Sequence, residues 1–177
     1  MRLFAHAPPT PEDQPHMDEF DSFVRSRSAA LLRSAYLLTG DQHLAEDLVQ
    51  SALARTHRAW GRLRDRGNVE AYTRRTMYHL QVSWWRRHRA EAMPGELPEP
   101  RGGVDHADQS AVRMVLRAAL LKLSAKQRAV LVLRYFEDCT ETEAAHLLGV
   151  SVGTVKSQTS KALAKLREIY RLEGAVR

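Results

Sequence analysis

The sequence predicts an all-α protein with two small helical domains joined by a flexible acidic linker. Apolar residues recur at spacings of three, four and seven, which is the period of an amphipathic helix, and no alternating strand pattern occurs. A stretch with three prolines and three glycines over 91–109 interrupts this pattern and cannot hold a helix through its middle. We therefore expect one domain over 18–90, a second over 110–177, and a disordered, proline-rich tail over 1–17.

Composition and charge exclude several classes of protein. The 177 residues are 44% hydrophobic and 27% charged, which is typical of a folded soluble protein. No apolar run approaches the ~18 residues of a membrane span, and the start has no apolar stretch of signal-peptide length. We expect a cytoplasmic protein without membrane insertion. The lone Cys139 and the scattered histidines predict no disulfide, metal or cofactor, and we find no nucleophile–base pair or phosphate loop that would indicate an enzyme.

Three helices are expected in the N-terminal domain. Gly40 suits the left-handed backbone just past the end of the first helix, and Asp41 can cap the second. An arginine-rich loop, GRLRDRG, occupies 61–67, and Asn68 can cap the third helix. The expected helical ranges are 18–39, 42–60 and 69–89.

The third helix mixes arginines with aromatic residues. Residues 51–90 hold ten basic and two acidic side chains. Guanidinium groups neutralise phosphate and aromatic faces stack on unpaired bases, so this helix is a candidate surface for melted nucleic acid. Aromatic residues on a helix are more often core, and we expect Tyr72 and one of Trp84 and Trp85 to be buried. The pattern alone leaves both interpretations open.

The second helix gathers acidic and amide side chains opposite its apolar stripe. These residues are Glu46, Asp47 and Gln50. Such a face is a poor contact for DNA. It either stays solvated or docks a basic protein partner.

The C-terminal domain is expected to contain a helix-turn-helix. After a helix that begins near residue 110, two short helices start at the capping boxes SAKQ, 124–127, and TETE, 140–143. Ala145, Gly149 and Val155 then have the spacing of a small residue at the helix crossing, a turn glycine and an apolar plug.

The last helix, expected over 152–171 with Ser151 as its cap, carries short polar or basic side chains opposite its apolar side. Lysine binds phosphate or guanine, and Ser and Gln reach base edges. Such groups near a helix N-terminus suit a recognition helix in a major groove. The alternative is a helical hairpin with a solvated polar face. The residues concerned are Thr154, Lys156, Ser157, Gln158, Ser160 and Lys161.

Motifs in both halves resemble the sigma-70 family. The run AEDLVQ at 45–50, with RAW at 58–60 and the arginine-rich helix that follows, resembles conserved region 2. The stretch from LSAKQ to KLRE, 123–168, resembles region 4. With only these two regions and a short linker, the chain is similar to an extracytoplasmic-function (ECF) RNA polymerase sigma factor over about 18–171. The resemblance implies a dissociable subunit with three partners: core RNA polymerase, promoter DNA and an anti-sigma factor.

The resemblance also implies a role for each surface. The acidic face of the second helix, Glu46, Asp47 and Gln50, corresponds to residues that bind core polymerase, and Val112–Phe136 corresponds to the surface that holds the polymerase flap tip. The polar row of the last helix corresponds to the residues that face the −35 element. Contacts to the −10 element are implied for Asn68, Arg74, Arg75, Tyr78, Trp84, Trp85, Arg86 and Arg87.

The expected linker is acidic. Residues 91–109 hold five acidic side chains and one basic side chain, and the resemblance implies a strand that lies on the path of nascent RNA. An ordinary solvated tether is the alternative.

Two other functions stay open for the whole chain: a helix-turn-helix regulator that binds duplex DNA without polymerase, and an adaptor that binds only proteins. Initiation by added core polymerase separates them from a sigma factor.

Overall fold

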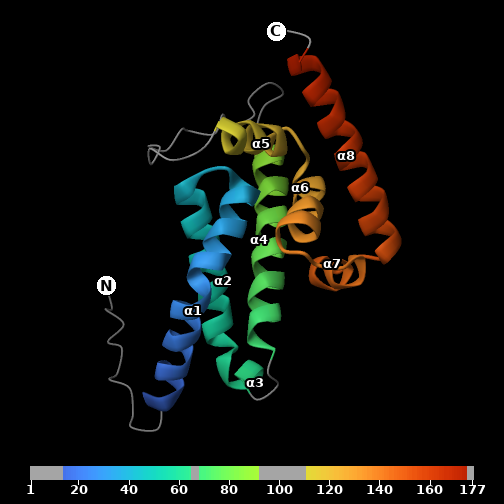
Figure 1. Ribbon diagram of the computed structural model, residues 1–177. Coiled ribbons are helices and arrows are strands. Elements are labelled where there is room, and N and C mark those ends of the chain that lie inside the picture. The colour runs from blue at the N-terminus through green and yellow to red at the C-terminus, as the bar shows by residue number, and fades with distance from the viewer. Residues whose placement is uncertain (1–13, 65–67, 92–110, 175–177) are drawn as a thin grey trace.

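The computed structural model describes residues 14–64, 68–91 and 111–174 (Figure 1). These residues are almost entirely helical and contain no β-strand, so the predicted all-α class is confirmed. The elements are α1 (Gln14–Thr39), α2 (Gln42–Arg58), α3 (Trp60–Arg64), α4 (Val69–Glu91), α5 (Ala111–Leu121), α6 (Ala125–Leu131), the π-helix η1 (Val132–Phe136), α7 (Glu141–Leu148) and α8 (Val152–Gly174).

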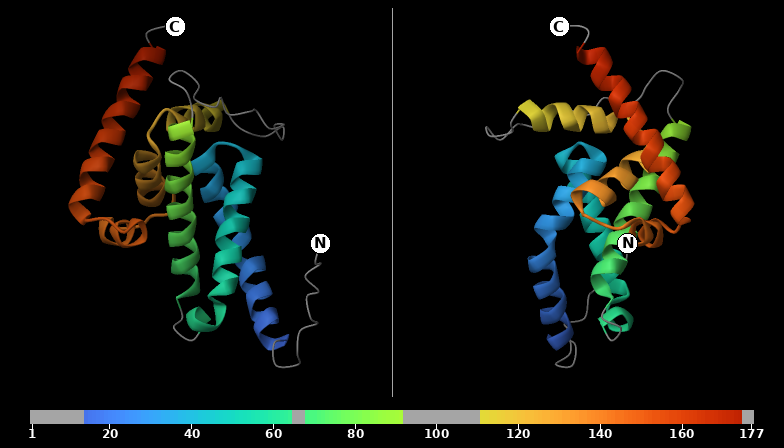
Figure 2. Two further views of the ribbon diagram at one scale, coloured as in Figure 1. Left: turned by 180° about the vertical axis from the view of Figure 1, so that it is seen from behind. Right: turned by 45° about the vertical axis from the view of Figure 1, so that its right-hand side comes forward.

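The long helices α1, α2 and α4 lie side by side and form the N-terminal half (Figures 1 and 2). Gly40 makes the first corner with a φ of 73°, and the Asp41 side chain accepts a hydrogen bond from the Leu44 amide at 2.9 Å. Both predicted signals at this corner are therefore confirmed. Across the bundle, the buried hydroxyls of Thr56 and Thr73 are hydrogen-bonded at 2.9 Å and join α2 to α4.

Two predicted boundaries in the N-terminal half were wrong. The first helix begins at Gln14 rather than at residue 18, so residues 14–17 belong to α1 and not to a disordered tail. Residues 61–64 belong to the short helix α3 rather than to a loop. The reason for α3 is tertiary: the Trp60 ring packs edge-on against Phe20, with ring centroids 5.0 Å apart, and this contact fixes the chain just after α2.

The C-terminal half follows the predicted caps. Ser124 and Thr140 each make both hydrogen bonds of a capping box, with Gln127 and Glu143 respectively. Gly149 has a φ of 66°. The helix-turn-helix of α7 and α8 packs around Val155, which is 0% exposed, and this motif is confirmed.

The short helix expected after the capping box at 124–127 is a regular α-helix only to Leu131, and the next five residues form the π-helix η1. The chain leaves η1 through the amide of Glu137, which donates to the Val132 carbonyl at 3.1 Å. Asp138 then has a φ of 49°, the left-handed region that an aspartate tolerates better than most residues. The turn directs Glu137 toward α4.

The two halves are packed against each other through a shared core. Leu38 of α1 and Met77 of α4 lie in the same buried cluster as Leu133 of η1 and Ala144 of α7. In both figures α6 lies beside α4, while α8 lies outside α6 and α7 (Figures 1 and 2). Residues 92–110 lie outside the described residues, so the predicted acidic linker and the domain boundary at 91–109 stay predictions.

Arg128 fastens the junction between the halves. Its side chain is 0% exposed and donates hydrogen bonds to the carbonyls of Leu38, Leu121 and Leu123. These carbonyls lie at or just beyond the C-terminal ends of α1 and α5, where helix carbonyls lack partners within the helix. Burial lowers the pKa of Arg128 to about 10.

Candidate nucleic-acid and polymerase interfaces

The polar row of α8 faces solvent. Val155 and Ala162 are fully buried against the rest of the C-terminal half, and this fixes the opposite face outward. Five of the six predicted residues are exposed, and Gln158 is half-buried. Lys156 Nζ lies 3.6 Å from a carboxylate oxygen of Glu141 on α7. The structure therefore brings the predicted −35 residues together on one accessible face.

Two hydroxyl groups of this row already form hydrogen bonds within the protein. The Ser151 and Thr154 hydroxyls are hydrogen-bonded at 2.9 Å, and Ser157 Oγ donates to the Thr154 carbonyl at 3.0 Å. The ammonium groups of Lys156 and Lys161 are consequently the strongest groups on this face for an anionic partner.

The predicted −10 residues do not form one exposed surface. Asn68 and Arg75 are exposed, and Trp84 is half-buried. Arg74 is half-buried, and Tyr78 is 0% exposed. The side chains of Trp85, Arg86 and Arg87 lie outside the described residues. Tyr72, which was expected in the core, is only half-buried, whereas Tyr78 is fully buried and contacts Glu137 of the C-terminal half. The two tyrosines are six residues apart, so they lie on different sides of α4.

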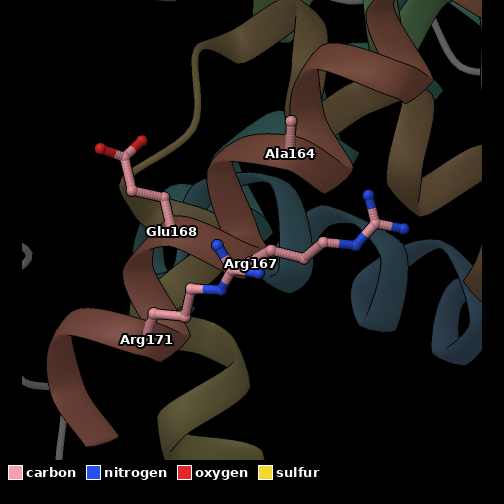
Figure 3. A pocket seen from close by; sticks show the side chains of 4 residues that line it. All are labelled: Ala164, Arg167, Glu168 and Arg171. Atoms are coloured by element: carbon pink, nitrogen blue, oxygen red, sulfur yellow. The ribbon is translucent and has the colours of Figure 1, made fainter. Parts of the chain in front are cut away.

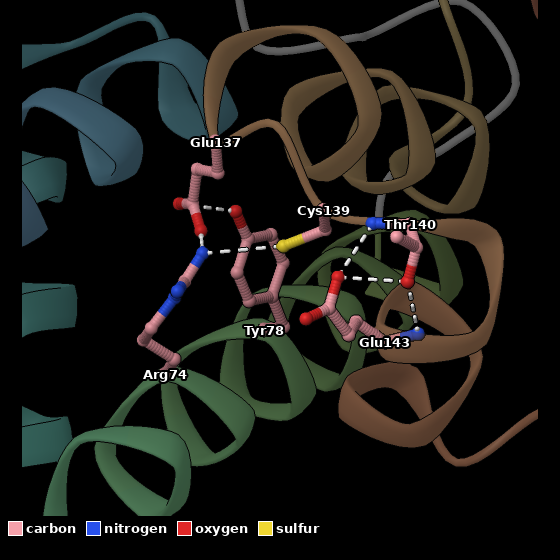
Figure 4. Close-up of polar contacts among 6 residues, drawn as sticks. All are labelled: Arg74, Tyr78, Glu137, Cys139, Thr140 and Glu143. Atoms are coloured by element: carbon pink, nitrogen blue, oxygen red, sulfur yellow. Dashed lines mark hydrogen bonds and ion pairs between the residues drawn. The ribbon is translucent and has the colours of Figure 1, made fainter.

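Arg74 and Tyr78 join a polar cluster between the halves (Figure 4). Arg74 forms an ion pair with Glu137, and the Tyr78 hydroxyl donates to Glu137 Oε1 at 2.7 Å. Arg74 Nη2 also lies 3.5 Å from Cys139 Sγ. Desolvation by burial raises the pKa of Tyr78, so its hydroxyl stays protonated and acts as a donor.

Glu137 was missed by the sequence analysis. It lies in the stretch RYFEDC, where no spacing or motif marks a functional carboxylate. Beside it, the capping box of α7 holds Glu143 through the Thr140 backbone N–H and hydroxyl, and these bonds lower the pKa of Glu143.

The acidic face of α2 is accessible. Asp47 and Gln50 are exposed, and Glu46 is half-buried and accepts a hydrogen bond from Gln42 Nε2 at 2.7 Å. Leu48 and Ala52, on the other side of α2, are buried. The helix thus presents its polar groups as expected.

Exposed apolar side chains occur in two elements of the segment 112–136, α5 and η1. Large hydrophobic side chains of α5 and η1 are 36–54% exposed. They are Met114, Val115, Leu116, Tyr135 and Phe136.

The side chains that line a hollow on the C-terminal part of α8 do not form the arrangement of a catalytic site. It is lined by Ala164, Arg167, Glu168 and Arg171, all from one helix (Figure 3). Within the described ranges, no group of three or more His, Cys, Asp or Glu is placed to hold a metal ion. In the same ranges, no helix is long and apolar enough to cross a membrane.

Comparison with protein families matches both halves of the chain. Residues 23–91 match the family described as Sigma-70 region 2, and residues 113–166 match Sigma-70, region 4. The chain is 46% identical over 151 residues to the RNA polymerase sigma-E factor of Streptomyces coelicolor, covering 85% of each protein. It is 32% identical to the ECF RNA polymerase sigma factor SigE of Mycolicibacterium smegmatis, covering 88% of this chain and 63% of that protein.

Solved structures give the same result. The sigma factor RpoE of Bartonella quintana, in complex with the anti-sigma factor NepR, matches with a TM-score of 0.68 and 26% identity. This match covers 86% of the present chain and 97% of RpoE. CnrH, in complex with the cytosolic domain of CnrY, matches with a TM-score of 0.55 and 23% identity, which supports the fold. The chain therefore belongs to the sigma-70 family of RNA polymerase sigma factors, in its extracytoplasmic-function group.

Proposed function

We propose that this sigma factor directs core RNA polymerase to promoters by reading duplex −35 DNA with α8. The observation that carries this proposal is the exposed polar row of α8. Val155 and Ala162 anchor one side of the helix, so Lys156, Ser157, Ser160 and Lys161 are held outward. A rigid helix that presents lysines and short hydroxyl groups near its N-terminus fits a major groove.

The other surfaces bind core polymerase and the −10 strand. The acidic face of α2, with Asp47 and Gln50 exposed, binds core polymerase, and the apolar side chains of α5 and η1 bind a second polymerase element. Asn68, Arg74, Arg75, Tyr78 and the segment 84–87 of α4 receive the unpaired −10 strand. Binding energy drives both recognition and local melting, and the chain itself makes or breaks no covalent bond.

The protein is proposed to act in the cytoplasm and to be regulated by an anti-sigma factor. A polymerase subunit acts where the polymerase is, and we place the protein in the cytoplasm. The matched RpoE and CnrH structures are complexes with NepR and with the cytosolic domain of CnrY. A protein of the anti-sigma class is therefore proposed as a partner of this chain as well.

Run-off transcription with purified core polymerase tests the proposal. The wild-type protein is expected to direct initiation from a −35/−10 promoter. Lys161→Ala should weaken −35-dependent initiation and leave core binding intact, whereas Asp47→Ala should weaken core binding. Lys165→Ala, which removes the same charge from an exposed site one turn further along α8, is the matched control.

Two results would overturn the proposal. The first is a wild-type protein that binds palindromic duplex DNA alone and never directs initiation. The second is an equal loss of core binding in Lys161→Ala and Asp47→Ala, which would contradict the division between the two surfaces.

A further inference from the structure

The carboxylate of Glu137 lies between two donors of α4 (Figure 4). Arg74 and Tyr78 are four residues apart, so they lie on the same side of that helix, and both bind this one carboxylate. The side chains of Arg74 and Glu137 are 24% and 10% exposed, and Tyr78 is 0% exposed. The cluster is thus a nearly closed oxyanion site whose donors and acceptor come from opposite halves.

The donors of this site suit a phosphodiester as well as a carboxylate. Guanidinium groups bind both anions through N–H···O bonds, and a phenolic hydroxyl adds a neutral donor to either. A backbone phosphate carries one negative charge and two unesterified oxygens, as a carboxylate carries one charge and two oxygens. Arg74 and Tyr78 are also among the residues of α4 proposed to meet the −10 strand.

The C-terminal half holds Glu137 in position. Its amide is bonded to Val132 of η1, and the left-handed Asp138 turns the chain immediately after it. Arg134 donates to the carbonyl of Cys139 on the other side of this turn. Since π-helices occur frequently at functional sites, we regard the turn as a built feature rather than a flexible loop.

We propose that Glu137 is an internal substitute for a backbone phosphate of the −10 strand, and that it locks the two halves together until nucleic acid displaces it. The packed form and the strand-bound form then exclude each other, because one oxyanion site holds one anion. Removing Glu137 without a replacement would leave Arg74 charged and half-buried, so an arriving phosphate is the natural exchange partner. This inference rests on the proposed function of α4.

The single cysteine gives a direct measure of opening. Cys139 is 6% exposed and contacts Arg74 across the junction, and the sequence has no other cysteine. Its rate of reaction with a thiol reagent should rise when the halves separate. A fluorescent oligothymidylate serves as the single-stranded probe, at low salt, with the isolated full-length protein.

Glu137→Gln is the test variant and Glu168→Gln the control. Both remove one negative charge, but Glu168 is exposed on α8, away from the junction. We expect Glu137→Gln to bind the oligonucleotide about fivefold more tightly or better, and to react faster at Cys139. Adding Arg74→Gln to Glu137→Gln should abolish the gain in affinity. In the unmodified protein, the oligonucleotide alone should accelerate the reaction of Cys139.

Several outcomes would overturn the inference. Equal gains in Glu137→Gln and Glu168→Gln would mean that only net charge matters. A Cys139 rate in the unmodified protein that ignores bound oligonucleotide would mean that binding does not open the junction, and this measurement needs no variant that might misfold. If the wild-type protein still directs run-off transcription in that case, the lock fails and the proposed function stands. If transcription itself is absent, the proposed function fails.

Discussion

Arg128 is a buried charge that donates hydrogen bonds to three carbonyls at or just beyond helix ends. The negative ends of the α1 and α5 dipoles both point at its guanidinium. The guanidinium spreads five donors over a planar fork and so reaches Leu38, Leu121 and Leu123 at once, whereas the three donors of a lysine ammonium radiate from a single nitrogen. At neutral pH the group remains protonated, because its pKa, although lowered to about 10, is well above 7.

Replacing Arg128 tests how much this junction contributes to stability. Arg128→Met keeps much of the volume but removes the guanidinium donor from the carbonyls of Leu121 and Leu123, and leaves the Leu38 carbonyl with only the longer bond from Gln81. We therefore expect a loss of about 3 kcal/mol in the free energy of unfolding. Arg128→Lys should lose less, because the charge remains. Urea denaturation followed by circular dichroism measures both. A methionine variant as stable as the wild type would show that the guanidinium is not needed.

The capping box of α7 predicts a pH dependence. Glu143 has a folded-state pKa below its ordinary value, because the Thr140 N–H and hydroxyl bind its ionised form. The stability from this cap is therefore fully present above the ordinary glutamate pKa and is lost as the pH falls through the folded value. Glu143→Gln keeps a capping side chain that does not titrate.

Comparing the unfolding free energies of the wild type and Glu143→Gln between pH 7 and pH 3 checks this prediction. The difference between the two proteins should shrink or reverse in the acid range. Two curves that stay parallel throughout would show that the cap is not coupled to the ionisation of Glu143.

At the scale of elements, Gly40 at the end of α1 serves both the turn into α2 and the packing against α5. Its φ of 73° favours glycine, and a Cβ at this position would lie 2.5 Å from Leu121 Cδ2 of α5. Its carbonyl also accepts hydrogen bonds from Arg117. The residue therefore allows both the turn into α2 and the close approach of the C-terminal half.

Gly40→Ala should cost about 2 kcal/mol of stability, from left-handed backbone strain and from overlap with Leu121. Gly61→Ala is the matched control, since nothing lies within 4 Å of a Cβ there, and it should be neutral or slightly stabilising. Thermal unfolding compares the two. Adding Leu121→Ala should remove the overlap with Gly40→Ala but not the strain, and a neutral Gly40→Ala would contradict both causes.

The elements that sequence predicted well are those decided by neighbouring residues. A capping box or a glycine turn is settled within about four residues, and Ser124, Thr140 and Gly149 behave as expected. The elements it missed depend on distant partners. Trp60 needs Phe20 to hold α3 in place, and the choice of Tyr78 over Tyr72 for burial needs the C-terminal half.

At the scale of the whole molecule, local sequence patterns could not predict how the two halves pack against each other. The apolar side chains of α6 and η1 predict helices with a buried side, but not that α4 and α1 cover it. The ion pair of Arg74 with Glu137 joins residues 63 positions apart in the sequence, across the linker. The identity of the sigma regions could be predicted from motifs, whereas the packed junction follows only from three-dimensional contacts.

The packed junction must open at a lower free-energy cost than unfolding if promoter surfaces on α4 are to become available. The chain contains its own probes: all three tryptophans lie in the N-terminal half, and the only cysteine lies in the C-terminal half. Reaction of Cys139 under native conditions should report a sub-global opening that exposes less surface than complete unfolding. Its urea dependence should therefore be shallower than that of the tryptophan fluorescence, which reports unfolding of the N-terminal half. Glu137→Gln should raise the native-state reaction rate without shifting the tryptophan transition by a comparable free energy. Identical urea dependences for both probes would mean that the halves separate only when the protein unfolds, so that no ligand could free the α4 surface of a folded protein.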